Sequence, residues 1–127
     1  MISYVYRQKE LDVNTINKIL SVKGVFDLFV VETNCIDDGT VEYPNISGDV
    51  FLFIDKESAI NAYNVILSQV EVSECSIFDI TVSCYNIRRE DVEYPVSSDN
   101  ISEYYAEYMD SDNEIMSKRI IGEDLED

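Results

Sequence analysis

The sequence contains two pairs of matching segments, and this internal repeat constrains the fold more than any other feature. Phe26–Val30 recurs as Phe78–Val82, with phenylalanine, aspartate and valine at the same places. Val41–Pro44 recurs unchanged as Val92–Pro95. Two matches in the same order at nearly the same spacing predict a duplicated unit. We therefore expect a fold built from two like halves.

Hydrophobic periodicity predicts four strands and two helices in the order β-α-β-β-α-β. Asp12 and Asp55 are placed to cap the two helices, and Gly24 is placed to end the first. One strand segment is apolar on both faces, which favours a central strand, whereas the last alternates between apolar and polar residues, which favours an edge strand. In chain order, the expected strands are residues 2–7, 25–31, 50–54 (the apolar one) and 77–87 (the alternating one).

Two β-α-β halves resemble the ferredoxin-like fold, an α+β fold with an antiparallel four-stranded sheet and two helices on one face. The resemblance covers residues 1–90 and implies that the first and third strands are central. Residues 91–122 are expected to form an acidic C-terminal helical extension, with one helix from about 99 to 118 that ends before Gly122. Residues 123–127 are expected to be disordered.

The charge of the chain excludes several classes of function. There are 26 acidic and 9 basic residues, a net charge of −17, and residues 90–127 hold 13 of the acids but only 2 of the bases. Such a surface repels nucleic-acid phosphate and anionic lipid, so we expect no direct binding to nucleic acid or membrane. The chain has no histidine, no phosphate-binding glycine loop and no nucleophile motif, so we expect no enzyme activity, cofactor or metal.

The cysteines and the N-terminus favour a cytoplasmic protein. Cys35, Cys75 and Cys84 are odd in number, and none of them forms a C-x-x-C pair. The first residues lack the basic and apolar regions of a signal peptide, and no apolar run approaches the roughly 20 residues of a membrane span. We therefore expect reduced thiols and a location in the cytoplasm, which would be the host cytoplasm for a phage-encoded protein.

Carboxylates at helical spacing mark the first candidate binding surface. Glu103, Glu107, Asp110 and Glu114 would lie within an arc of roughly 60° on a continuous helix, with no lysine among them. Their spacing of about 5–6 Å resembles the spacing of phosphates along a nucleic-acid strand. The alternative interpretation is a solvated helix face that keeps the protein soluble.

Tyrosines and a second group of acids extend this candidate surface. Tyr104 lies beside the carboxylates, and tyrosine suits an interface because its ring packs on arginine while its hydroxyl binds a polar group. Other tyrosines of the same helix could instead cover the sheet. The repeated Glu-Tyr-Pro segments could instead be turns in which proline ends a strand. The remaining candidate partner-binding residues are the acids of the first polar loop and one acid and one tyrosine of the second repeat: Asp37, Asp38, Glu42, Glu93 and Tyr94.

In charge, size and composition the chain resembles phage-encoded anti-defence proteins, such as anti-CRISPR and anti-restriction nucleic-acid mimics. This resemblance implies a non-catalytic inhibitor that binds the basic nucleic-acid-binding surface of a nuclease or effector complex. An immunity protein that neutralises a basic toxin nuclease is an alternative, since it would also bind through attraction between an acidic and a basic surface. A ferredoxin-like regulatory module that binds a small ligand or self-associates is another, although it leaves the acidic helix unexplained. A homodimer stays open for all three.

Overall fold

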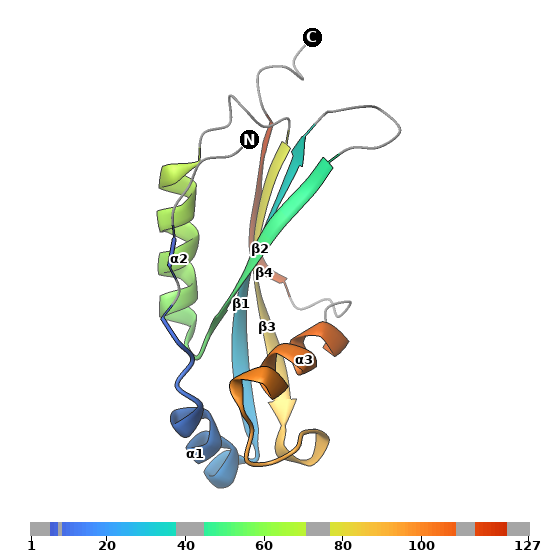
Figure 1. The fold of residues 1–127 in the computed structure, drawn as a ribbon. Coiled ribbons are helices and arrows are strands. Elements are labelled where there is room, and N and C mark those ends of the chain that lie inside the picture. Colours follow the sequence, from blue (N-terminus) through green and yellow to red (C-terminus); the bar gives the residue numbers. More distant parts are fainter. Residues whose placement is uncertain (1–5, 8, 38–44, 71–76, 109–113, 122–127) are drawn as a thin grey trace.

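The computed structural model describes residues 6–7, 9–37, 45–70, 77–108 and 114–121, and shows an antiparallel sheet with three helices (Figure 1). A single turn of 3-10 helix, Arg89–Asp91, follows the third strand. The main elements, in chain order, are α1 (Val13–Lys23), β1 (Val25–Asp37), β2 (Asn45–Phe53), α2 (Lys56–Gln69), β3 (Ile77–Arg88), α3 (Ser98–Tyr108) and β4 (Glu114–Ile121).

Local sequence signals explain where the first two helices begin and where α1 ends. The carboxylate of Asp12 accepts a hydrogen bond from the backbone N–H of Thr15 at 3.2 Å, and Asp55 accepts one from Ser58 at 2.8 Å. Gly24 adopts a left-handed conformation with φ 73°, and its N–H donates to the carbonyl of Leu20. A left-handed residue of this kind ends a helix at little cost only when it is glycine. The predicted caps and the predicted end of α1 are therefore confirmed.

The strand order differs from the ferredoxin-like prediction. The α+β class and the four-stranded antiparallel sheet are confirmed, but the order across the sheet is β2-β1-β3-β4. Of the predicted first strand, residues 2–7, the structure describes only Tyr6 and Arg7, and these lie outside any strand. As a result β1 and β3 are the central strands, whereas the apolar segment 50–54 contributes to the edge strand β2 and to the turn after it.

The helix predicted over residues 99–118 is wrong from Glu114 onward. The described part of α3 is Ser98–Tyr108, residues 109–113 lie outside the described residues, and Glu114 begins β4, which pairs with β3. In this pairing Ile120 lies opposite Phe78, and Arg119 lies opposite Asp79. The chain after residue 90 therefore supplies one edge of the sheet as well as a helix. Residues 123–127, expected to be disordered, lie outside the described residues.

The sheet has a core on each face. Successive side chains of a strand point to opposite faces, so Val31 joins one core and its neighbour Val30 joins the other. The core under α2 contains Val31, Phe51, Phe53, Ala59, Ala62, Tyr63, Ile66, Phe78, Ile80 and Val82. The core under α1 and α3 contains Ile16, Leu20, Phe26, Leu28, Val30, Tyr85, Ile87, Val96 and Ile101.

The repeated segments lie side by side in β1 and β3 but are not symmetric. Asp27 lies opposite Asn86, which donates a hydrogen bond to its carboxylate, and Asn34 lies opposite Asp79. The equivalent phenylalanines of the repeat, Phe26 and Phe78, nevertheless lie in different cores. The register of β1 against β3 places equivalent residues on opposite faces, so the two segments do not form matching β-α-β units.

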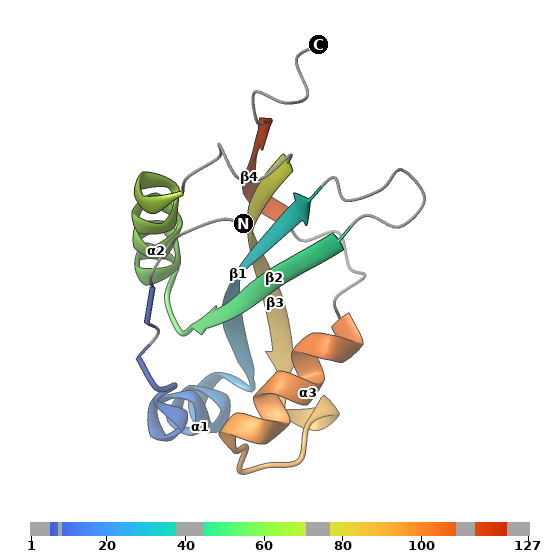
Figure 2. The ribbon, with the colours of Figure 1, turned by 45° about the horizontal axis from the view of Figure 1, so that its top comes forward.

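The segment before α3 is joined to α1 by a pair of hydrogen bonds. The side chain of Asn17 donates to the carbonyl of Val96 at 3.1 Å and accepts from the N–H of Val96 at 2.8 Å. Figure 2 shows α1 and α3 together at one end of the sheet, with α2 toward the other end. The helices therefore leave part of the sheet uncovered on the side away from α2.

Candidate partner-binding face

Alternate residues of all four strands form a surface that no described helix covers, on the side of the sheet away from α2. In one row Val50, Glu32, Thr81 and Ser117 lie opposite one another, and in the next row Gly48, Asn34, Asp79 and Arg119 do so. We call these eight residues the open sheet face. Tyr85 and Ile87, further along β3 on the same side, are buried under α1 and α3. The helices therefore cover only one half of this side.

Burial along β3 separates the open sheet face from the core behind it. Phe78, Ile80 and Val82 have no exposed surface, whereas Asp79 and Thr81 between them are half-buried. On β2, Val50 is 44% exposed, which makes it an apolar contact available to a partner. The alternation that predicted an edge strand for residues 77–87 in fact reports this uncovered face on a central strand.

An ion pair on the open sheet face joins the edge strand β4 to β3. The guanidinium of Arg119 donates to both carboxylate oxygens of Asp79, with distances of 2.7 and 2.9 Å. These hydrogen bonds, and then the charge of Asp79, raise the pKa of Arg119. Because Asp79 neutralises the cation of this face, the carboxylate of Glu32 leaves the eight residues with a net negative charge.

Gly48 allows β2 to approach β1 closely within the open sheet face. A Cβ atom at this position would lie 2.0 Å from the carbonyl oxygen of Thr33, far inside van der Waals contact. The buried hydroxyl of Thr33 accepts a hydrogen bond from the N–H of Asp49 at 3.0 Å. A side chain at Gly48 is therefore incompatible with this backbone, and glycine also leaves the face flat next to Asn34.

One end of the sheet is joined to segments that carry acids and no bases. Asp37 lies opposite Asn45, and Ile77 lies opposite both Ile36 and Ile121, so the four strands end together there. The segments that follow or precede these ends are residues 38–44, 71–76 and 122–127. Their sequences hold two, two and four acidic residues and no lysine or arginine. We call this the acidic end of the sheet.

The predicted carboxylate stripe does not exist as a single helix face. Glu103 is an exposed residue of α3, and Glu107 and Tyr104 belong to the same helix, although their side chains are not among those described. Asp110 lies outside the described residues. Glu114 is an exposed residue of β4, so it cannot continue the helical spacing, and that part of the prediction is wrong.

The other predicted residues lie at two ends of the sheet. Asp37 ends β1 at the acidic end, whereas Asp38 and Glu42 lie outside the described residues. Glu93 and Tyr94 lie in the loop before α3, at the opposite end. There the hydroxyl of Tyr94 donates to the carbonyl of Asn17 at 3.5 Å, and the guanidinium of Arg89 lies 5.9 Å from its ring centre. The structure therefore does not bring Asp37 and Tyr94 together.

Sequence reasoning missed Glu32, Thr81 and Val50 as surface candidates. The signal was present, because Glu32 and Asn34 alternate with buried residues just as Asp79 and Thr81 do. What the sequence did not reveal was that β1 and β3 are neighbours, which is what joins these two polar rows into one face.

Comparisons with known proteins give no family for this chain. No family model, curated protein or solved structure matches it. Within the described ranges, no three metal-binding side chains cluster, and no described helix is long and apolar enough to cross a membrane.

Proposed function

We propose that this protein is a non-catalytic acidic inhibitor that binds the basic nucleic-acid-binding surface of another protein, in the manner of an anti-CRISPR or anti-restriction nucleic-acid mimic. The observation that carries the proposal is the separation of charge along the chain. All nine basic residues belong to the described framework, whereas the three segments at the acidic end hold eight acids and no base. This end would present a basic partner with negative charges, as the phosphates of nucleic acid do.

In this proposal, charge governs the rate of association and short-range contacts supply most of the affinity. Long-range attraction between the acidic end and a cationic groove raises the rate of association and aligns the two proteins. Exposed ion pairs contribute little to the final affinity, so short-range contacts must supply the rest. The open sheet face adjoins the acidic end and offers exposed Val50 beside Glu32 and Thr81 for such contacts.

Competition with nucleic acid tests the proposal. The immobilised protein is used to capture partners from a cell lysate, and each captured nucleic-acid-binding protein is purified. Binding of that partner to its DNA or RNA is then measured by gel shift while the acidic protein is added. We expect inhibition that excess nucleic acid relieves. A ternary complex with nucleic acid still bound would contradict the proposal, and capture of a small toxin nuclease alone would favour the immunity alternative.

Matched charge variants test the position of the interface. Glu32→Lys with Thr81→Lys changes the open sheet face, and Glu57→Lys with Asn64→Lys makes the same change in net charge on exposed positions of α2. The first pair is expected to weaken binding to the captured partner at least about tenfold more than the second. Equal losses would show that net charge matters but that the open sheet face is not the interface.

A further inference from the structure

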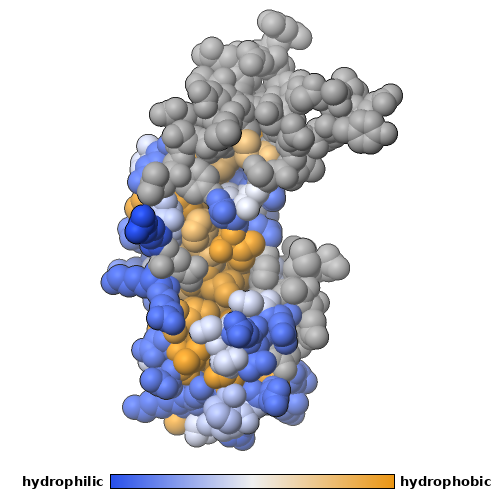
Figure 3. Space-filling model, viewed as in Figure 1, coloured by the Kyte–Doolittle hydropathy of each residue, from blue (hydrophilic) through white to orange (hydrophobic). Residues whose placement is uncertain are grey.

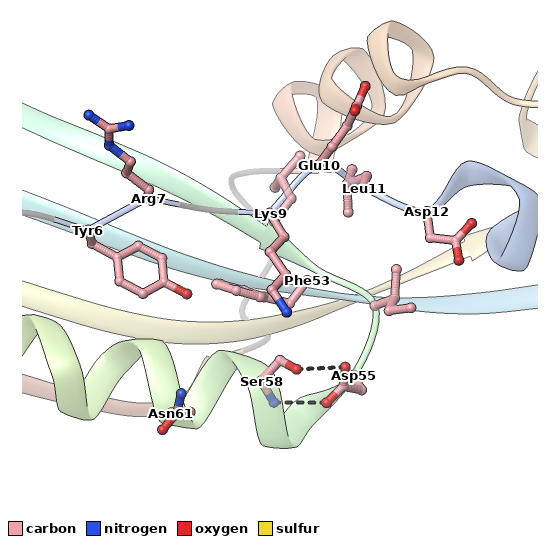
Figure 4. A pocket seen from close by; sticks show the side chains of 12 residues that line it. Tyr6, Arg7, Lys9, Glu10, Leu11, Asp12, Phe53, Asp55, Ser58 and Asn61 are labelled. Carbon is pink, nitrogen blue, oxygen red and sulfur yellow. Dashed lines mark hydrogen bonds between the residues drawn. The ribbon is translucent and has the colours of Figure 1, made fainter.

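A pocket of about 400 Å³ lies where the N-terminal segment crosses the end of β2 and the first turn of α2 (Figure 4). This volume lies within the range of small-molecule sites in proteins. Its apolar lining comes from Leu52, Phe53 and Ile54, which are consecutive residues at the end of β2, and from Tyr6. The pocket is separate from the open sheet face, and nothing in the proposed function uses it.

Aromatic packing holds the N-terminal segment over the pocket. The ring of Tyr6 packs edge-on against Phe51, with ring centres 5.0 Å apart, and against Phe53 at 6.4 Å. On the other side, Leu11 packs against the core under α1 and α3. Burial raises the pKa of Tyr6, which keeps its hydroxyl protonated and able to donate a hydrogen bond. The pocket is therefore bounded by anchored residues on both sides of Lys9.

Lys9 is the cation of the lining whose side chain is directed into the pocket. Its side chain runs across Phe53 toward the first turn of α2, whereas Arg7 and Glu10 point away from the pocket (Figure 4). Within the part of the chain that the structure describes, Lys9 forms no ion pair. In a chain with 26 acids, a lysine directed into a pocket without a carboxylate partner stands out.

The nearby carboxylates are already used as helix caps. Asp55 accepts hydrogen bonds from both the N–H and the hydroxyl of Ser58, at 2.8 and 2.9 Å. Asp12 accepts from the N–H and the hydroxyl of Thr15 in the same way, at 3.2 and 2.7 Å. Both carboxylates therefore accept hydrogen bonds at helix N-termini, and no ion pair joins either of them to Lys9 among the described residues.

We infer that this pocket binds a small organic anion with a flat apolar body, such as an aryl carboxylate or sulfonate. The flat body lies against Phe53 and Leu52, whose burial from water favours binding. The anionic group pairs with the ammonium of Lys9, which Figure 4 shows directed across Phe53. Figure 3 shows apolar side chains gathered in a strip down the middle of the face seen in Figure 1.

The test uses 8-anilinonaphthalene-1-sulfonate as the probe and the full chain as the protein. Titration followed by fluorescence is expected to show saturable binding of one probe per chain. Lys9→Ala should weaken this binding by about two- to fivefold, because it removes the cation from an ion pair at an exposed position. Lys23→Ala is the matched control, since it removes an exposed lysine from the last turn of α1 and should leave binding unchanged.

A second variant and a spectroscopic readout keep the inference falsifiable. Asn61→Trp places a large ring at an exposed position that lines the pocket and should block the probe without disturbing the core. Amide chemical shifts of the wild-type protein should change on titration at Lys9, Phe53 and Ser58 and stay constant across β4. Absence of saturable binding, equal affinity of the Lys9→Ala and Lys23→Ala variants, or shift changes confined to other regions would overturn the inference.

Discussion

Two phenylalanine substitutions test whether β3 is central and β2 is an edge. Phe78 is fully buried on β3, between β1 and β4, and Phe53 is 8% exposed at the end of β2. Replacing a buried phenylalanine by alanine costs about 3–5 kcal/mol, and the cost rises with the volume of the cavity that is left. Phe78 has no exposed surface and lines neither pocket described, so Phe78→Ala should lie at the upper end, about 4–5 kcal/mol.

Phe53→Ala should cost less because the space it leaves opens into an existing cavity. Phe53 lines the pocket of about 400 Å³, so water can enter the vacated volume. We expect about 3 kcal/mol, the lower end of the range. Urea unfolding of both variants, with a common dependence on denaturant, gives the two values. A larger loss for Phe53→Ala than for Phe78→Ala would refute the strand order, as would a loss below about 1 kcal/mol for Phe78→Ala.

Three further predictions concern helix caps and the close approach of two strands. Asp55→Ala should lower the free energy of unfolding by about 1 kcal/mol in a denaturant titration, because it removes the cap of α2. The hydrogen bonds from Thr15 lower the pKa of Asp12 in the folded state. The contribution of Asp12 to stability is therefore present above its unfolded pKa and is lost as pH falls through its folded pKa. Asp12→Asn keeps a cap but does not titrate, so it should flatten the acid limb of a stability–pH curve, and an unchanged limb would contradict this. Gly48→Ala should cost about 1–3 kcal/mol and remove hydrogen-exchange protection from β2 before β3, because the new methyl group meets the carbonyl of Thr33.

Local structure could be predicted from the sequence because its signals are local. Asp12, Asp55 and Gly24 act on backbone groups within a few residues, and each does so as expected. The strands over 25–31 and 77–87 were also found, although β1 extends to Asp37. Periodicity correctly reports which residues of a strand are buried, and this part of the prediction holds across the central sheet.

Lateral position in the sheet could not be predicted, because periodicity reports the burial of faces and says nothing about neighbours. Residues 50–54 are apolar on both faces because Tyr6 and α2 cover one side of them and Leu11 the other, while one long edge of β2 stays unpaired with any described strand. Residues 77–87 look half-polar because the open sheet face is uncovered, although β3 has a strand on each side.

The predicted carboxylate stripe was wrong at Glu114 because helical spacing does not show where a helix ends. The apolar spacing from Ile101 to Met109 is helical, and nothing in that spacing separates Glu114 from the helix. The contrary signal is compositional: residues 110–113 read Asp-Ser-Asp-Asn, which are poor helix formers, and the β-branched residues Ile115, Ile120 and Ile121 follow. Weighing that composition would have separated Glu114 from the helix.

The dependence of partner affinity on ionic strength tests most directly the claim that this protein acts through its negative potential. The dissociation constant of the complex with a captured partner is measured at about 50 and about 500 mM NaCl, which shortens the screening length from above 10 Å to below 5 Å. We predict that affinity falls at least about tenfold over this range. An affinity that stays constant or rises with salt would contradict the account.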